Sequence, residues 1–159
     1  NDNPILTTRG SKKPEPLRVV FTKTLDLPEK SNLWDCNLAR TIVVYDSSTA
    51  NEKFLKRIPS CVEVEQISSD NPLLLSNLLA KKGCNKVLWE CGPKLATSAL
   101  KAGCIQELMT FIAPKILGGK SSMNPFADFE FVDMKEVINL CSTEVNFIGK
   151  DICVKSSIL

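Results

Sequence analysis

The feature that most constrains the fold of this chain is the alternation of short β-branched runs with segments of helical spacing. Strands are expected at residues 17–22, 40–46, 61–67 and 85–90, and each of the last three leads into a segment that can form a helix. Strands that alternate with helices are typical of a parallel sheet, because the helix carries the chain back to the edge where the next strand begins. The sequence therefore predicts an α/β fold with a mostly parallel sheet.

Start and stop signals place the helices. Asp70 or Asn71 can cap a helix over residues 72–83, and a second helix with proline at its start and glycine at its end is expected over residues 93–103. Residues 51–58 form a short amphipathic segment that a proline ends. These helices follow the expected strands, as the alternation requires.

The C-terminal third is β-rich and carries few helix signals. A long strand is expected over residues 107–119, and residues 146–151 have the composition of a hairpin turn between two further strands. Because a hairpin joins antiparallel strands, we expect antiparallel strands beside the parallel ones. No repeat or linker interrupts the sequence, so we expect one domain over residues 1–159.

The composition is that of an ordinary globular protein, with 43% apolar and 24% charged residues. The net charge is +2 and both signs are interspersed, so charge gives no reason to expect nucleic acid or an anionic membrane as a partner. No apolar run approaches the roughly 20 residues that span a bilayer, and the first residues do not resemble a signal peptide. Since the chain starts without methionine, we expect a fragment or a processed protein.

The seven cysteines occur singly, and the chain contains no histidine and no C-x-x-C pair. We therefore expect no metal site of the zinc or haem kind. Catalysis that depends on histidine, as in Ser-His-Asp and Cys-His hydrolases, is excluded. Because the count is odd and most cysteines lie in or beside apolar runs, we expect reduced, mostly buried thiols in an intracellular protein and no disulfide framework.

Polar residues follow three of the expected strands. In open α/β sheets, ligands bind at the carboxyl ends of strands, close to helix N-termini. Residues 45–51 (YDSSTAN), 89–94 (WECGPK) and 118–122 (GGKSS) occupy such ends. The hydroxyls of Ser47 and Ser48 can hold a phosphate or a ribose, although serine, glycine and asparagine also form ordinary turns and caps.

The WECGPK segment is the strongest of these candidates. Gly92 lets a ligand approach the backbone, Pro93 opens the helix without wasting a donor, and Lys94 adds positive charge to the first helical turn. Glu90 can accept hydrogen bonds from a polar substrate in the same place. The structural alternative is that Glu90 is a solvated strand end and Cys91 a core residue.

A further candidate lies in the N-terminal segment DNPILTTR. Arg9 can form bidentate hydrogen bonds with a phosphate, and Asp2 can bind a ring nitrogen or a hydroxyl. Alone this observation is weak, because charges near a terminus are usually solvated.

Taken together, these segments resemble the reductase domain of bacterial-type riboflavin biosynthesis proteins, which is often the C-terminal half of a deaminase/reductase. The resemblance rests on DNPILTTR, PLRVVFTKTLDLP, WECGPKLATSALKAGCIQEL and FIAPKILGG, which follow one another in the order of the family's motifs. It covers nearly all of the chain up to Gly119. The combination is much more specific than any one motif.

The resemblance implies a dihydrofolate-reductase-like α/β fold, with a mostly parallel central sheet, antiparallel C-terminal strands and helices on both faces. It also implies NADPH-dependent reduction of 5-amino-6-(5-phosphoribosylamino)uracil, whose ribosyl group becomes a ribityl chain. Asp2 and Glu90 match the catalytic acids on the substrate side, and Leu6 and Arg9 match the segment that binds the substrate phosphate.

Two loops match the cofactor site of the family. One is expected to contact the dinucleotide phosphates through Cys91, Gly92, Pro93 and Lys94. The other, with Ser47 and Ser48, falls where the adenosine end of the cofactor is expected. The resemblance further implies a homodimer, a possible fusion to an N-terminal zinc deaminase domain outside this chain, and a location in the cytoplasm or, in a photosynthetic eukaryote, the plastid stroma.

The chain departs from the family pattern at Asn3, Thr22 and Gln106, each in place of Asp, and at Cys91, in place of Gly. A Cys at that position fits the turn only with a negative φ. The family's opening portion, with its first core strand, and the zinc signature of the deaminase are not in the sequence.

Two other functions remain open. One is a non-catalytic nucleotide-binding or assembly domain of the same fold, which the departures and the missing opening motif suggest. The other is a reductase of a related pterin or pyrimidine, which substrate competition would distinguish. The isolated chain can be inactive even where the whole protein is an enzyme.

Overall fold

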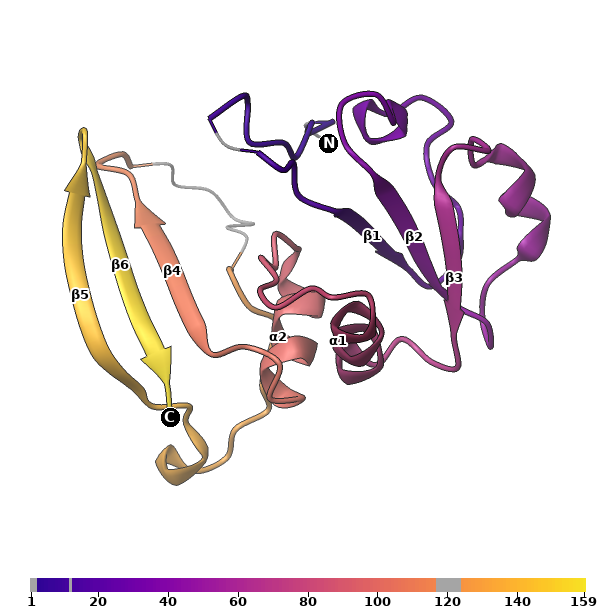
Figure 1. The fold of residues 1–159 in the computed structure, drawn as a ribbon. Coiled ribbons are helices and arrows are strands. Elements are labelled where there is room, and N and C mark those ends of the chain that lie inside the picture. The colour runs from indigo at the N-terminus through magenta and orange to yellow at the C-terminus, as the bar shows by residue number, and fades with distance from the viewer. Residues whose placement is uncertain (1–2, 12, 117–123) are drawn as a thin grey trace. The chain divides into compact units, whose positions relative to one another are not determined.

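The structure is a computed structural model that describes residues 3–11, 13–116 and 124–159. The chain divides into two compact units, Asn1–Asp70 and Asn71–Leu159, and each unit is described by itself. Both are visible in Figure 1, which labels their helices and strands.

Unit 1 contains a parallel sheet. Its strands β1 (Arg18–Thr22), β2 (Thr41–Asp46) and β3 (Glu63–Ile67) lie in the order β1-β2-β3 (Figure 1). The central strand β2 is buried along its whole length, which explains why its sequence TIVVYD is an almost continuous apolar run. The parallel pairing predicted for this part of the chain is confirmed.

The core of unit 1 lies against one face of this sheet. Leu25, Val43, Tyr45 and Val62 form its buried cluster. The short 3₁₀ helix η2 (Glu52–Arg57) supplies Phe54 and Leu55 to the same cluster. The helix expected over residues 51–58 is therefore present, and the Asn51 side chain caps it by accepting from the Lys53 N–H. A second 3₁₀ helix, η1 (Asn32–Trp34), brings Trp34 to the core.

The prediction of reduced, mostly buried cysteines is wrong in two respects. Cys36 and Cys61 form a disulfide, with Cα atoms 6.3 Å apart and 25 positions apart in sequence. The loop after η1 and the turn before β3 meet at the edge of the core. Because the cysteines occur singly along the sequence, their spacing gives no sign of this contact. Of the free cysteines, Cys153 is buried, whereas the others are half-buried: Cys84, Cys91, Cys104 and Cys141.

Unit 2 begins with two helices, α1 (Pro72–Lys81) and α2 (Pro93–Lys101). Both start at the predicted proline, and each is followed by a glycine with positive φ, Gly83 at +87° and Gly103 at +67°. The left-handed backbone that ends each helix is easy only for glycine. The two predicted helices are confirmed.

An antiparallel sheet completes unit 2. Its strands β4 (Glu107–Ile112), β5 (Leu140–Ile148) and β6 (Asp151–Ile158) lie in the order β4-β6-β5. A short 3₁₀ helix, η3 (Met134–Glu136), precedes β5. The β5–β6 hairpin turns at Gly149, with φ of +63°, as predicted. The strand expected over residues 107–119 is shorter than predicted, because Pro114 cannot donate to a sheet ladder.

The strand predicted at residues 85–90 is absent. The segment has no regular secondary structure, and its apolar side chains Val87 and Leu88 are 39% and 82% exposed. A strand needs a neighbour to pair with, and no strand in the described part of unit 2 pairs with this segment. Its apolar sequence indicates β propensity, but propensity alone does not produce a strand without a neighbour to pair with.

Candidate functional site

The predicted site residues are divided between the two units. Leu6, Arg9, Ser47 and Ser48 belong to unit 1, whereas Glu90 and residues 91–94 belong to unit 2. Asp2 lies outside the described residues, and so do residues 118–122, the third polar strand end of the sequence analysis.

The N-terminal segment has an unusual backbone at the residues that the sequence singled out. Leu6 and Arg9 have φ values of 51° and 50°. For residues with a Cβ, this left-handed region costs about 1–2 kcal/mol each. Arg9 and Gly10 form the centre of a tight turn that the Ser11 N–H closes on the Thr8 carbonyl at 3.0 Å. The turn leaves the Arg9 side chain exposed.

Hydrogen bonds to the rest of unit 1 hold this strained segment in place. Arg18, at the start of β1, is 2% exposed and donates to the Ile5 carbonyl at 3.2 Å and to the Ala39 carbonyl at 2.6 Å. Asn3 accepts from the Asn32 N–H at 2.8 Å. The amide at this position thus serves as an anchor where the family pattern has an acid.

A carboxylate secures the turn from its other side. Glu15 accepts hydrogen bonds from the Thr8 N–H at 2.8 Å and from the Thr8 hydroxyl at 2.9 Å. The Thr8 N–H is the main reason why the pKa of Glu15 lies below its ordinary value, and the Lys13 ammonium adds to the effect, whereas burial opposes it. Backbone strain that surrounding bonds maintain is a feature of functional segments.

The strand-end loop after β2 is organised by its own hydrogen bonds. The Ser47 N–H and hydroxyl both donate to the Ile67 carbonyl, at 2.9 and 3.0 Å. The Ser48 N–H and hydroxyl both donate to Asp46 Oδ1, at 2.8 and 2.6 Å. Ser47 and Ser48 are nevertheless exposed. Their oxygens can accept, but their donors are used within the protein.

The start of α2 is open. Its cap residue, Gly92, has no side chain to accept from the first helical turn, and in the described structure the N–H groups of Lys94 and Leu95 have no partner outside the helix. A hollow of about 420 Å³ lies against Gly92, Pro93, Lys94 and Leu95. The first turn of a helix carries partial positive charge, so the helix start itself suits an anion, although the wall of the hollow is mostly apolar.

Gly92 is not required by the fold. Its φ of −74° is available to any residue, and a Cβ added there would meet no atom of the described residues within 4 Å. The described residues therefore leave room beside the Gly92 backbone. α2 itself is anchored on its inner side, where the Ala127 N–H donates to Thr97 Oγ1 at 2.9 Å.

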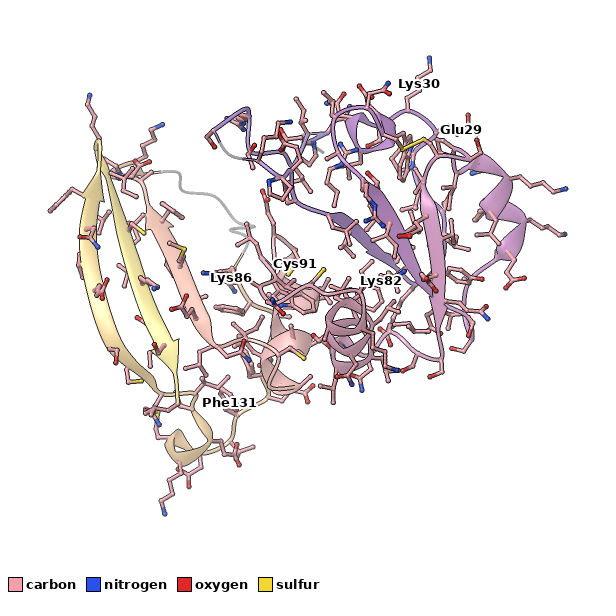
Figure 2. The ribbon with its side chains drawn as sticks, in the orientation of Figure 1. Glu29, Lys30, Lys82, Lys86, Cys91 and Phe131 are labelled. Atoms are coloured by element: carbon pink, nitrogen blue, oxygen red, sulfur yellow. A yellow bond between two sulfur atoms is a disulfide. The ribbon has the colours of Figure 1, made fainter. Side chains whose placement is uncertain are left out.

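Glu90 and Cys91 lie on the irregular connection that leads into α2, and Figure 2 labels Cys91 there. Glu90 is exposed, two residues before the helix cap. Cys91 is half-buried, and burial raises the pKa of its thiol. Cys91 is not among the described residues with positive φ, so the Cys in place of the family's Gly meets no backbone conflict.

A second hollow, of about 520 Å³, lies in unit 1. None of the predicted site residues contributes to it; its lining is Tyr45, Leu55, Ile58, Pro59, Ser60, Val62, Val64, Glu65 and Gln66. The residues of the site that sequence reasoning missed are Arg18 and Asp46, which act by holding the candidate segments. Both lie in segments that the sequence analysis quoted, Asp46 in YDSSTAN and Arg18 in PLRVVFTKTLDLP, but neither residue was singled out there.

Among the described residues, no group of three or more His, Cys, Asp or Glu side chains is placed to hold a metal ion. None of the described helices is long and apolar enough to cross a membrane.

Comparison with known proteins yields one family and a consistent set of relatives. The family model described as the RibD C-terminal domain matches residues 1–154. The riboflavin biosynthesis protein RibD of Synechocystis sp. is 37% identical over 152 residues, which are 94% of this chain and 41% of that protein. The chloroplastic riboflavin biosynthesis protein PYRR of Arabidopsis thaliana is 38% identical over 154 residues, 96% of this chain and 26% of that protein.

Solved structures show the same fold. Acinetobacter baumannii RibD matches with a TM-score of 0.75 and 22% identity, over 99% of this chain and 44% of that one. A Thermotoga maritima protein, named a diaminohydroxyphosphoribosylaminopyrimidine deaminase/5-amino-6-(5-phosphoribosylamino)uracil reductase, matches with a TM-score of 0.73 and 21% identity, over 100% and 42%. These likenesses confirm the predicted dihydrofolate-reductase-like α/β fold class. The chain spans less than half the length of each of these relatives.

Proposed function

The chain belongs to the RibD C-terminal domain family, and from that premise we propose that it is the reductase part of a riboflavin biosynthesis protein. The proposed reaction is the NADPH-dependent reduction of 5-amino-6-(5-phosphoribosylamino)uracil to its ribitylamino product. The reaction named for the Thermotoga maritima neighbour supports the substrate. NADPH and the use of this substrate by the present chain are both parts of the proposal.

The observation that carries the proposal is the open start of α2. The pyrophosphate of a nicotinamide nucleotide needs several hydrogen-bond donors and positive potential, and the uncapped N–H groups of Lys94 and Leu95 supply both beside a hollow of about 420 Å³. Gly92 adds a backbone that a phosphate can approach closely. The neutral thiol of Cys91 places no negative charge there. When bound, the cofactor would supply the hydride.

The roles proposed for the substrate side follow from the family resemblance. Arg9, exposed on its strained turn, would bind the 5′-phosphate of the substrate, with Leu6 shaping the same segment. Asp2 and Glu90 would orient the sugar or the pyrimidine. A carboxylate close to an imine nitrogen also favours the protonated imine, which is the better hydride acceptor.

We further propose that residues 1–159 act as a single reductase domain that pairs with a second copy. Support for pairing comes from β5, an edge strand of its sheet on which Val145 and Phe147 are 60% and 77% exposed. Exposed apolar edge strands promote association. Sedimentation of the full-length protein would reveal a dimer, and a monomer at micromolar concentration would contradict this part.

The test of the proposed function is NADPH oxidation by the full-length protein with the phosphoribosylamino substrate. We expect Glu90→Gln and Arg9→Ala each to reduce kcat/KM, Arg9→Ala mainly through KM for the phosphorylated substrate. Glu29→Gln and Arg40→Ala are matched controls, because both side chains are exposed and pair only on the surface. Full activity in both site variants would remove Glu90 and Arg9 from the site.

The same assay separates the other functions. If the wild-type protein binds NADPH but does not oxidise it in the presence of any pyrimidine tested, it is a non-catalytic nucleotide-binding domain. Faster turnover of a pterin or another pyrimidine in direct competition would make the protein a related reductase instead.

A further inference from the structure

The Cys36–Cys61 disulfide joins two turns of unit 1, and Figure 2 draws it as a yellow bond. Cys36 lies in the turn after η1, and Cys61 lies in the turn before β3. The two sulfurs differ in access, because Cys61 is exposed whereas Cys36 is half-buried and packs against the core cluster. A thiolate from outside the protein reacts with the sulfur that it can reach. The bond is therefore placed for thiol exchange from the Cys61 side.

The loop that contains Cys36 supports the N-terminal segment. This loop, residues 31–39, bonds to Asn3 at two points. The Asn32 N–H donates to Asn3 Oδ1 at 2.8 Å, and the Asn32 side-chain amide donates to the Asn3 carbonyl at 2.7 Å. The N-terminal segment continues from there to the strained turn at Arg9. A displacement of the loop would thus reach that segment directly.

Arg18 makes a second connection between the loop and the N-terminal segment. Its buried guanidinium donates to the Ile5 carbonyl at 3.2 Å. It also donates to three carbonyls of the loop, those of Asn32, Asp35 and Ala39, at 3.3, 2.8 and 2.6 Å. A buried cation is costly unless its donors are satisfied. Since the loop supplies three of these four acceptors, its position determines how Arg18 can hold Ile5.

The two parts of the loop are held in different ways. The part up to Trp34 has anchors of its own, because Trp34 packs against the core and the Thr41 hydroxyl donates to the Leu33 carbonyl at 2.7 Å. The part after Trp34 is a turn that the Arg18 bonds and the disulfide attach to the rest of unit 1. Opening the disulfide would remove a covalent support from the turn that presents two of the acceptors of Arg18.

We propose that the Cys36–Cys61 disulfide is a redox switch for the segment that carries Arg9. A thiolate of a protein dithiol attacks Cys61 Sγ, the bond between the two cysteine sulfurs breaks, and Cys36 leaves as a thiolate that takes up a proton. The second thiol of the dithiol then attacks the mixed disulfide and releases Cys61. The dithiol loses two electrons and becomes a disulfide, and the two cysteines gain them. Exchange with an oxidised dithiol runs the same steps in reverse.

Reduction is the direction that lowers activity. Loosening the turn after Trp34 weakens the hold of Arg18 on the Ile5 carbonyl, and Arg9 then loses its fixed position for the substrate phosphate. The inference rests on the proposed function at this point, since it takes Arg9 as the phosphate ligand. The residues proposed to bind the cofactor phosphates belong to unit 2 and share none of these contacts.

The test is reduction of the full-length wild-type protein with dithiothreitol. KM for the phosphoribosylamino substrate is expected to rise about five-fold, as it would if the ordered segment fell to about a fifth of the molecules. The value of kcat and KM for NADPH should each stay within about two-fold. An unchanged KM for the substrate would overturn the inference. Peptide mapping checks that the two cysteines pass from linked to free, and cysteines that are free before treatment would overturn it as well.

The variant Cys36→Ser/Cys61→Ser represents the open state. It should show the high KM without dithiothreitol and no further change with it, and a response equal to that of the wild type would contradict the switch. Cys84→Ser and Cys141→Ser are the matched controls, because both cysteines are free and half-buried. Both controls should respond to dithiothreitol as the wild type does. If the double variant does not fold, reduction of the wild type remains a complete test.

A measurement without substrate separates the switch from the proposed function. In nuclear magnetic resonance spectra, reduction should shift the amide signals of Leu6 and Thr8 and leave those of Val43 and Val44, in the buried strand β2. Equal shifts in both pairs would indicate a general loosening of unit 1, and no shift at Leu6 and Thr8 would show that the bond does not control the segment; either result overturns the inference. If the protein oxidises no NADPH with the substrate, the proposed function fails, whereas these signals still decide whether the disulfide controls the segment.

Discussion

The two helices of unit 2 start in nearly the same way and differ at one position. Both α1 and α2 place proline in the first turn. In α1 the cap residue is Asn71, whose side chain accepts from the Leu73 N–H at 2.9 Å. In α2 the cap residue is Gly92, which has no side chain that could accept a hydrogen bond. One helix satisfies its first-turn donors within the protein, whereas the Lys94 and Leu95 N–H groups of the other have no partner outside the helix among the described residues.

The rest of each helix agrees with this difference. α1 buries Pro72, Leu75 and Leu79, so it is held by apolar packing. α2 buries only Thr97 and Ala99, and the Thr97 hydroxyl fixes it to the Ala127 backbone. A helix held by such specific bonds presents its start in a defined position. An uncapped helix start is informative where the neighbouring helix, as here, has a side-chain cap.

The largest effect on NADPH affinity is expected from adding a capping side chain at the open start of α2. Gly92→Asp adds a carboxylate that can accept from the first turn and repels phosphate. We expect it to weaken NADPH binding by roughly 100-fold while leaving the free energy of unfolding unchanged or higher, because Asp is a preferred cap. Fluorescence titration of NADPH and thermal unfolding measure the two quantities.

Gly92→Ala is the control for this variant. Its methyl group meets none of the described residues within 4 Å, so we expect a change in NADPH affinity of less than about three-fold. Undiminished affinity in Gly92→Asp would show that the start of α2 does not face the phosphates.

A smaller effect is expected from removing the charge beside the open start. Lys94 is exposed in the first turn of α2. Lys94→Gln should weaken NADPH binding about five-fold at low salt, and the difference from wild type should shrink as salt screens the charge. Lys81→Gln, in the last turn of α1, is the matched control. An equal loss in both variants would indicate a general effect of net charge.

Removing the side-chain cap of α1 should lower the stability of the protein and leave NADPH binding unchanged. Asn71→Ala removes the bond to the Leu73 N–H, and we expect the free energy of unfolding to fall by about 1 kcal/mol. NADPH affinity should stay at the wild-type value. Denaturant unfolding measures the loss, and a matching fall in NADPH affinity would mean that α1, too, supports the nucleotide.

The smallest effect concerns pH. Burial raises the pKa of the Cys91 thiol above its ordinary value of 9.0, so the group is neutral below that pH. Because the folded pKa lies above the unfolded one, the stabilisation is complete below about pH 9 and is lost as pH rises through the folded pKa. NADPH affinity should stay flat to about pH 9 and decline slightly above it. Cys91→Ser should remove the decline, and an identical decline in that variant would assign it to another group.

How far the sequence could predict these features depends on how local their causes are. Asn71, Pro72 and Gly83 are a cap, a start and a stop that act on their own helix, and the structure confirms all three. The run at residues 85–90 failed as a strand because pairing depends on a partner that local propensity does not supply. The prediction of no disulfide failed for the same reason, since the Cys36–Cys61 bond joins loops that only the fold brings together.

The candidate site shows the same limit. The sequence placed Ser47 and Ser48 at a strand end, which the structure confirms. It could not show that their donors turn inward, because that depends on Asp46 and the Ile67 carbonyl. Gly92 was predicted as a place of close approach, and the structure adds that no described residue comes within 4 Å of a Cβ placed there.

The most direct test of the open start is a nuclear magnetic resonance titration of isotope-labelled protein with NADPH. The backbone amides of Lys94 and Leu95 report on the uncapped start of α2, and those of Leu73 and Leu74 report on the start of α1, which Asn71 caps. We predict saturable shifts at Lys94 and Leu95 and none at Leu73 and Leu74, whose N–H groups already bond to Asn71. Saturable binding with no shift at Lys94 and Leu95, or with equal shifts at both helix starts, would contradict the account.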